Sequence, residues 1–397
     1  MQFTSYLNLR TRQRPTCVAA MLLALVACQP LTAAPPQTTV PSAAQPNKSD
    51  TLDTRPIALV YLPDWVDTTP DMLPLDDLTH ICHAFATATP EGQLLTGDHI
   101  PNTPLIKEAH KHGVKMLLSV GGADSDVYLA PIAQDPAKLD RFIGELITFV
   151  KTHHYDGIDL DWEFPLTQES AQGLAAMVHQ LKLEIEQLEQ QTGKDYLLTR
   201  AVGGGWAYTH VPTELFRDNF DFLNVMGYDC AGPWEETAAH HAPLTASTQG
   251  AAKNVETVQS ILNHWKDERG LPASQLVLGM PAYGRGFKGV NMFDPVEKNS
   301  PAHAEYSYAQ ITEKQAAGWT LTRLDNGAPW LIAPDQSEII GFDDPQSIAQ
   351  KTQWAMSQGL AGVFFWEATQ DRMADNSHPL IQAAVKNLPL QNTPQPQ

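Results

Sequence analysis

The chain has few cysteines and few basic residues for its length. It contains 4 Cys in 397 residues, and 26 Lys and Arg stand against 45 Asp and Glu, which gives a formal net charge of −19. So few cysteines exclude the disulfide framework of small secreted domains. The acidic balance argues against nucleic acid as a partner, because phosphate backbones are bound by clustered Lys and Arg.

Metal-ligand spacing is also missing. None of the 14 His residues lies at the spacing of a known metal motif, so we expect no metal and no cofactor. The pairs His153-His154 and His240-His241 are interpreted as surface features. Cys82 and Cys230 are interpreted as small buried hydrophobic residues.

The N-terminus has no apolar run long enough to cross a bilayer. The run Val18–Ala27 follows the basic residues Arg10, Arg12 and Arg14 and is shorter than a membrane span. It ends in Leu25-Val26-Ala27-Cys28, which resembles a bacterial lipobox. We therefore expect residues 1–27 to be a lipoprotein signal peptide and Cys28 to carry the lipid that anchors the protein to a membrane.

Gln29 follows this Cys, and in lipoproteins a residue other than Asp there indicates sorting to the outer membrane of a Gram-negative cell envelope. The alternative is an ordinary secretory signal cut near Ala33 or Ala34, which would leave the protein secreted or periplasmic. Residues 28–55 are rich in Pro, Thr, Gln and Ala and predict a flexible tether, and residues 389–397 predict a disordered tail.

Between tether and tail, residues 56–388 alternate strand-like apolar runs with helical patterns. The helical stretches include 139–151, 168–190, 255–268 and 346–357, the last preceded by a capping Asp344 and by Pro345 at the first helical position. The strand candidates are Ile57–Tyr61, Thr79–Ala86, Val114–Val120, Gly157–Trp162, Leu197–Val202, Phe222–Tyr228, Leu276–Ala282 and Gly362–Trp366. Eight such units in series favour an α/β protein with a (β/α)8 TIM barrel over a doubly wound open sheet.

The interval before the last strand is too long for one crossover helix. It contains further strand-like pieces at Trp319–Arg323, Trp330–Ala333 and Glu338–Phe342. We interpret residues 288–341 as a small α+β insertion between strands 7 and 8, on the face of the barrel where ligands bind.

One predicted strand contains the candidate catalytic carboxylates. In Asp156-Gly157-Ile158-Asp159-Leu160-Asp161-Trp162-Glu163, alternation places three carboxylates on one face and three apolar side chains, including Trp162, on the other. In a barrel the apolar face packs outward against helices, and the carboxylates stack inside with Glu163 at the catalytic rim. Burying three like charges is costly, so this pattern indicates function. Close carboxylates raise one another's pKa, as a general acid requires.

The pattern Asp156-x-x-Asp159-x-Asp161-x-Glu163 resembles the signature of glycoside hydrolase family 18, the chitinases and their relatives. Four further segments resemble motifs of that family, each at a strand end: Ser119–Gly122, Met226–Asp229, Pro281–Arg285 and Gly362–Glu367. The resemblance implies hydrolysis of β-1,4-linked N-acetylglucosamine polymers by a retaining, substrate-assisted mechanism. The expected partner is an N-acetylglucosamine-containing glycan, and the protein is expected to act as a monomer.

The resemblance also implies roles for individual residues. Glu163 would protonate the glycosidic oxygen, Asp161 would orient the 2-acetamido group that attacks, and Asp159 would share a proton with Asp161. Tyr228 would bond the acetamido oxygen and Asp229 would bind sugar hydroxyls.

Trp366 would form the floor under the sugar. Trp234, Tyr61, Tyr283 and Arg285 are further candidate sugar contacts.

Two questions stay open from the sequence. Some members of the family have lost the acid and are lectin-like, whereas Glu163 is present here. Ala123 stands where strongly chitin-degrading members commonly have an aromatic residue, which favours soluble oligosaccharides over crystalline chitin. Peptidoglycan and N-glycans also offer N-acetylglucosamine and remain alternative substrates.

Overall fold

The computed structural model describes residues 55–249 and 256–389. The predicted signal peptide, Cys28 and almost all of the predicted tether and tail lie outside these ranges. In the residues described, no helix is long and apolar enough to cross a membrane.

Eight parallel strands form a closed barrel. The strand order is β1-β14-β8-β7-β6-β5-β4-β2, and β1 also pairs with β2, so the sheet has no free edge between them. This confirms the predicted (β/α)8 barrel, because an open doubly wound sheet would leave two edge strands. The strands are β1 (Ile57–Pro63), β2 (His80–Ala88), β4 (Lys115–Gly122), β5 (Gly157–Trp162), β6 (Leu197–Val202), β7 (Phe222–Val225), β8 (Leu276–Pro281) and β14 (Gly362–Trp366). A short β3 (Leu94–Thr96) adds to β2 antiparallel.

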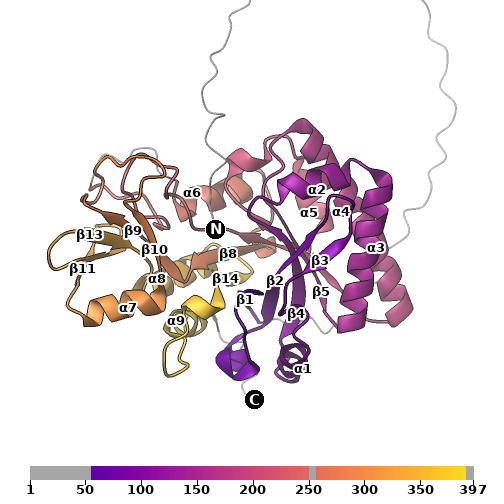
Figure 1. The fold of residues 1–397 in the computed structure, drawn as a ribbon, viewed down its shortest axis with the longest axis horizontal. Helices are drawn as coiled ribbons and strands as arrows, with labels where there is room; N and C mark the ends of the chain where they lie inside the picture. Colours follow the sequence, from indigo (N-terminus) through magenta and orange to yellow (C-terminus); the bar gives the residue numbers. More distant parts are fainter. Residues whose placement is uncertain (1–54, 250–255, 390–397) are drawn as a thin grey trace, which may run out of the picture. The chain divides into compact units, whose positions relative to one another are not determined.

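Helices cover the outside of the barrel (Figure 1). Asp344 caps α8, since its Oδ1 accepts the Ser347 backbone N–H at 2.9 Å and Pro345 occupies the first helical position, as predicted. The helices are α1 (Thr103–Lys111), α2 (Asp126–Ala133), α3 (Pro136–His153), α4 (Gln168–Thr192), α5 (Thr213–Asn219), α6 (Val258–Asn263), α8 (Pro345–Ser357) and α9 (Pro379–Val385).

The alternation of side chains along each strand separates two cores. Inward-facing residues of the barrel form one cluster, which includes Leu59, Phe222 and Phe364. Outward-facing residues pack with the helices in a larger cluster that contains Trp162, which is fully buried. Trp162 therefore faces the helices, as its position on the carboxylate strand predicts.

The insertion is a five-stranded antiparallel sheet with one helix, coloured orange and brown on the left of Figure 1. Its core includes Phe287, Trp330 and Ile339. The sheet starts at Tyr283, ahead of the predicted boundary at residue 288, because only Ala282 separates β9 from β8. Its elements are β9 (Tyr283–Lys288), β10 (His303–Ser307), α7 (Tyr308–Ala316), β11 (Thr320–Arg323), β12 (Pro329–Ile332) and β13 (Glu338–Gly341).

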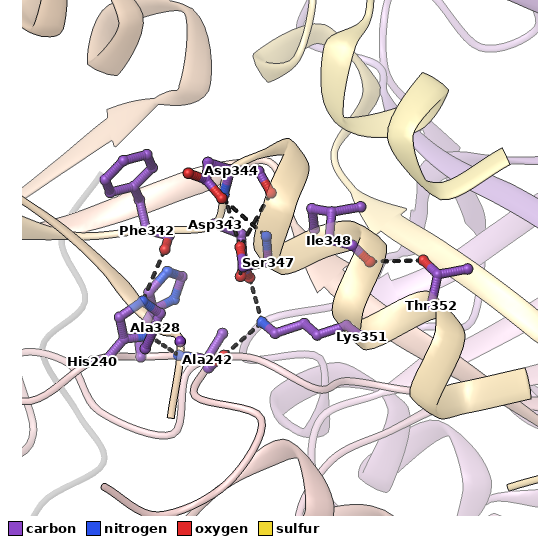
Figure 2. A network of polar contacts seen from close by, with 12 residues as sticks. His240, Ala242, Ala328, Phe342, Asp343, Asp344, Ser347, Ile348, Lys351 and Thr352 are labelled. Atoms are coloured by element: carbon purple, nitrogen blue, oxygen red, sulfur yellow. Dashed lines mark hydrogen bonds and ion pairs between the residues drawn. The ribbon is translucent and has the colours of Figure 1, made fainter. Parts of the chain in front are cut away.

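A buried polar network ties the end of the insertion to α8 and to the segment around His240 (Figure 2). Lys351 forms an ion pair with Asp343 and donates to the Ala242 carbonyl at 2.5 Å. His240 donates from Nε2 to the Phe342 carbonyl at 2.8 Å. His240 and His241 are both buried, so their prediction as surface residues is wrong: the insertion and α8 cover the segment that carries them.

Candidate active site

The barrel places Asp159 and Asp161 side by side on β5 and Glu163 just past the carboxyl end of that strand. Asp159 is fully buried, Asp161 is 3% exposed, and Glu163 is half-buried. The exposure thus rises along the strand toward the carboxyl rim, where the residues after each barrel strand are free to meet a ligand.

Asp159 is held by four side-chain donors from four different strands. Its two carboxylate oxygens accept hydrogen bonds at 2.7–3.2 Å from Tyr61, Ser119, Thr199 and Asn224. Burial raises the pKa of Asp159, and these hydrogen bonds oppose the rise. Tyr61 is 1% exposed and donates its hydroxyl to Asp159, so it supports that carboxylate, and its contact with a sugar stays a prediction.

Asp161 has a buried carboxylate oxygen, Oδ1, with no hydrogen-bond partner. Its pKa is raised well above the usual value, first by burial and then by Glu163 and Asp159, while Arg200 opposes the rise. In the described part of the chain Asp159 and Asp161 are not hydrogen-bonded to each other, and the sharing of a proton between them stays a prediction. An unpartnered buried acceptor is destabilising, which points to a donor supplied by a ligand.

Glu163 is positioned through its backbone. Ser125 accepts the Glu163 N–H at 2.8 Å and donates to the Asp161 carbonyl at 3.2 Å. Burial raises the pKa of Glu163 to about 7, Asp229 and Asp124 add to the rise, and Arg200 opposes it. Glu163 can therefore hold its proton near neutral pH, as a general acid requires.

Gly121 allows β4 to approach the carboxylate strand closely. Its φ is +123°, and a Cβ there would lie 2.0 Å from the Asp161 carbonyl oxygen. Only glycine fits this position, which explains its place in the segment Ser119–Gly122.

Tyr228 and Asp229 follow β7, which ends at Val225 and is three residues shorter than predicted at this end. Burial, and after it Asp161, raises the pKa of Tyr228 well above its usual value, so the hydroxyl keeps its proton as a donor. Burial alone would raise the pKa of Asp229, but the Arg285 guanidinium and His241 more than offset it and hold that pKa well below its usual range.

Asp229 is fixed by residues of the insertion. Arg285 donates to both of its oxygens, at 2.8 and 2.7 Å, and Tyr283 donates at 2.7 Å. Tyr283 is 4% exposed and its hydroxyl is engaged by Asp229, so it supports that carboxylate, and its contact with a sugar stays a prediction. The side chain of Arg285 is mostly buried and also pairs with Glu305, which makes it a support for Asp229.

Aromatic side chains surround the rim. The Trp366 ring stacks on Phe85 at 5.7 Å and contacts the exposed Trp65 at 6.3 Å between ring centroids. The half-buried Trp234 ring lies 5.0 Å from the Arg285 guanidinium. Trp366 and Trp234 thus remain candidates for contact with a sugar.

Several residues of the site were not identified from the sequence. Strand alternation could have identified them, because each is a polar or aromatic residue within or just after a barrel strand. The residues that they contact lie on other strands, so these contacts could not be predicted from the local sequence. These residues are Trp65, Phe85, Ser125, Thr199, Arg200 and Asn224. Among the described residues, no group of three or more His, Cys, Asp or Glu is arranged to hold a metal ion.

Comparison with known proteins gives consistent matches. The model of the glycosyl hydrolases family 18 matches residues 57–371. Chitinase 1 of Aphanocladium album is 26% identical over 376 residues, covering 85% of this chain and 86% of its own length. Endochitinase 1 of Metarhizium robertsii is 26% identical over 353 residues, covering 80% and 82%.

Among solved structures, a mutant class V chitinase from Nicotiana tobaccum in complex with NAG4 superimposes with a TM-score of 0.75. It is 23% identical, and the match covers 84% of this chain and 99% of that one, which shows the shared fold. With the family model matching most of the chain and the carboxylates at the carboxyl rim of a closed barrel, this protein belongs to glycosyl hydrolase family 18.

Proposed function

We propose that the protein hydrolyses β-1,4-linked N-acetylglucosamine oligosaccharides, with retention of configuration and with Glu163 as the general acid. Membership of the family and the chitinase names of its relatives support the substrate class. The half-buried position of Glu163 and its pKa of about 7 support the role of the acid.

The observation that carries the mechanism is the unpartnered Oδ1 of Asp161. In substrate-assisted hydrolysis, the carbonyl oxygen of the 2-acetamido group attacks the anomeric carbon, and the N–H of that group needs a buried acceptor. Asp161 offers this acceptor, and the protonated hydroxyl of Tyr228 is available to the acetamido oxygen. A buried acceptor left unsatisfied costs about 1–3 kcal/mol, which a bound substrate would recover.

Within this class we favour soluble oligosaccharides, because Ala123 provides no aromatic surface beside the third-strand motif. Peptidoglycan, N-glycans and binding without turnover are outcomes of the same test. The wild-type protein and Glu163→Gln are incubated in parallel with chitooligosaccharides, peptidoglycan and N-glycans, and the products are identified by mass spectrometry.

We expect cleavage of chitooligosaccharides and a loss of at least ~10²-fold in kcat for Glu163→Gln, with binding retained, since the amide keeps the shape but has no acidic proton. Turnover in the variant close to wild type contradicts the role of Glu163. Binding without any turnover by the wild type would indicate a lectin-like protein.

We also propose that the mature protein is lipid-anchored through Cys28 in the cell envelope. The proposal depends on the lipobox-like sequence Leu25–Cys28 and on the Pro- and Gln-rich segment after it.

A further inference from the structure

Arg200 is a fully buried cation that the roles given above do not use. It lies on β6 with the opposite alternation to Thr199, so it points out of the barrel into the layer between strands and helices. Its Nη2 donates to the Trp162 carbonyl at 3.2 Å, and its Nε and Nη1 have no hydrogen-bond partner.

No carboxylate compensates this charge directly. None of the ion pairs between described residues includes Arg200, and its guanidinium instead lies 5.6 Å from the Tyr208 ring and 5.9 Å from the Phe216 ring. Burying an unpaired ion costs more free energy than the neighbouring aromatic faces return. Stability of the fold therefore gives no reason for a cation at this position.

The carboxylate strand lies directly beside it. Arg200 pairs in register with Leu160, between Asp159 and Asp161, and the carbonyl to which it donates belongs to the residue before Glu163. The other titratable group against the guanidinium is the Tyr208 hydroxyl. Asp229 and Asp124 add negative charge around Glu163 from outside β5.

We propose that Arg200 is a positioning residue whose buried charge counters the carboxylates of β5 and sets the pH at which Glu163 gives up its proton. The inference goes beyond the proposed function and rests on it for the role of Glu163 as the acid. Burial and the neighbouring carboxylates raise the pKa of Glu163, and the Arg200 charge restrains that rise. Without the cation, the acid would stay protonated to higher pH, and the basic limb of the activity profile would move upward.

Two neutral variants separate charge from contact. Arg200→Met keeps apolar volume among the aromatic rings, and Arg200→Gln keeps an N–H donor for the Trp162 carbonyl. Arg200→Lys keeps the charge. Arg269→Met is the matched control, because Arg269 lies over the same Phe216 ring at 4.9 Å, whereas the charges that shift the pKa of Glu163 are those of Asp229, Asp124 and Arg200.

The measurement is the pH profile of kcat/KM on a chitooligosaccharide. We expect the basic limb to move up by about 0.5–1 pH unit in both neutral variants, and to stay in place in Arg200→Lys and Arg269→Met. Neutral variants that fold normally but leave the limb unchanged overturn the inference, as does an equal shift in Arg269→Met.

A second readout needs no turnover, so failure of the proposed function can be told apart from failure of this inference. The pKa of Glu163 is raised above its unfolded value, so its contribution to the unfolding free energy falls as pH rises between the two pKa values. The difference in unfolding free energy between wild type and Glu163→Gln is measured as a function of pH. It reports the pKa of Glu163 in the folded state, which is the upper of the two values. We expect this upper pKa to be higher in the Arg200→Met background, and an unchanged value contradicts the inference even if the protein proves to be a lectin.

Discussion

At the scale of single residues, Asp159 and Asp161 are only two positions apart on β5 but have different surroundings. Asp159 is saturated by donors from four strands, whereas Asp161 keeps a buried oxygen without a partner. The first arrangement fixes a charge in place, and the second leaves room for a donor that the protein does not supply. This difference favours Asp161 as the proposed substrate contact and Asp159 as a residue that supports it.

The protonation of Glu163 predicts the pH dependence. Its pKa of about 7 lies above the ordinary value of 4.5, and the acid must hold its proton to act. We expect kcat/KM to fall about tenfold per pH unit above about pH 7, and Asp229 to stay ionised throughout because its pKa lies well below its usual range. A pH series on a defined chitooligosaccharide measures the limb, and full activity at pH 9 contradicts the assignment.

The free oxygen of Asp161 predicts a requirement for the acetamido group. Asp161 lies on β5 and Glu163 directly after it. Two residues apart in an extended chain means about 6.6–6.8 Å between Cα atoms, a spacing that also invites assignment as a nucleophile and acid pair. We expect instead that an oligomer deacetylated only at the sugar on the non-reducing side of the cleaved bond is not hydrolysed. A thiazoline analogue of the cyclic intermediate should inhibit.

The fully acetylated oligomer is the control, and its β-anomer should be retained because two inversions occur. Efficient cleavage of the deacetylated oligomer, or a covalent glycosyl adduct on Asp161 in a peptide digest, contradicts the mechanism.

At the scale of elements, Lys351 on α8 and Asp343 after β13 form an ion pair that is almost completely buried. Removing one partner leaves an uncompensated buried charge, so we expect Lys351→Met to lower the unfolding free energy by about 3–5 kcal/mol. The double variant Lys351→Met, Asp343→Leu should recover a large part of this loss. Denaturant titration measures both, and Lys111→Met, in the exposed pair with Glu108, is the control, expected to cost less than about 1 kcal/mol. Equal losses in Lys351→Met and Lys111→Met contradict the prediction.

Local patterns predicted the elements well, because alternation and capping are local. The bounds of β5, β6 and β14 agree with the prediction, and so does the cap of α8. The errors concern contacts between distant segments. His240 is buried by the insertion and α8, about a hundred residues later in the chain, and nothing in its own neighbourhood reveals that cover.

The same limit applies to the candidate site. The three carboxylates of β5 and its carboxyl end were identified from alternation alone. Which carboxylate each nearby hydroxyl donates to depends on the register between strands. Tyr61 and Tyr283 were expected to reach sugars, and their hydrogen bonds to Asp159 and Asp229 were not predicted. Arg200 was missed because a single arginine in an apolar strand gives no periodic signal.

At the scale of the whole molecule, the candidate catalytic residues all lie in the unit that begins at Arg55, and Cys28 lies outside the residues that the structure describes. If Cys28 carries the lipid, the anchor and the catalytic residues are independent of each other. We expect Cys28→Ala to release the protein from membranes while kcat and KM stay unchanged. Detergent-phase partitioning and sensitivity to globomycin measure the anchor, and a variant that still partitions with membranes contradicts the lipoprotein prediction.

The short junction between β8 and β9 limits how this protein can be re-engineered or can diverge. Only Ala282 separates the barrel strand from the strand that carries Tyr283 and Arg285, which hold Asp229. A chimera that exchanges the whole insertion for a relative's would exchange the supports of Asp229 with it. Variation in the insertion must therefore keep Tyr283 and Arg285, and the first residues of β9 must be inherited with the barrel.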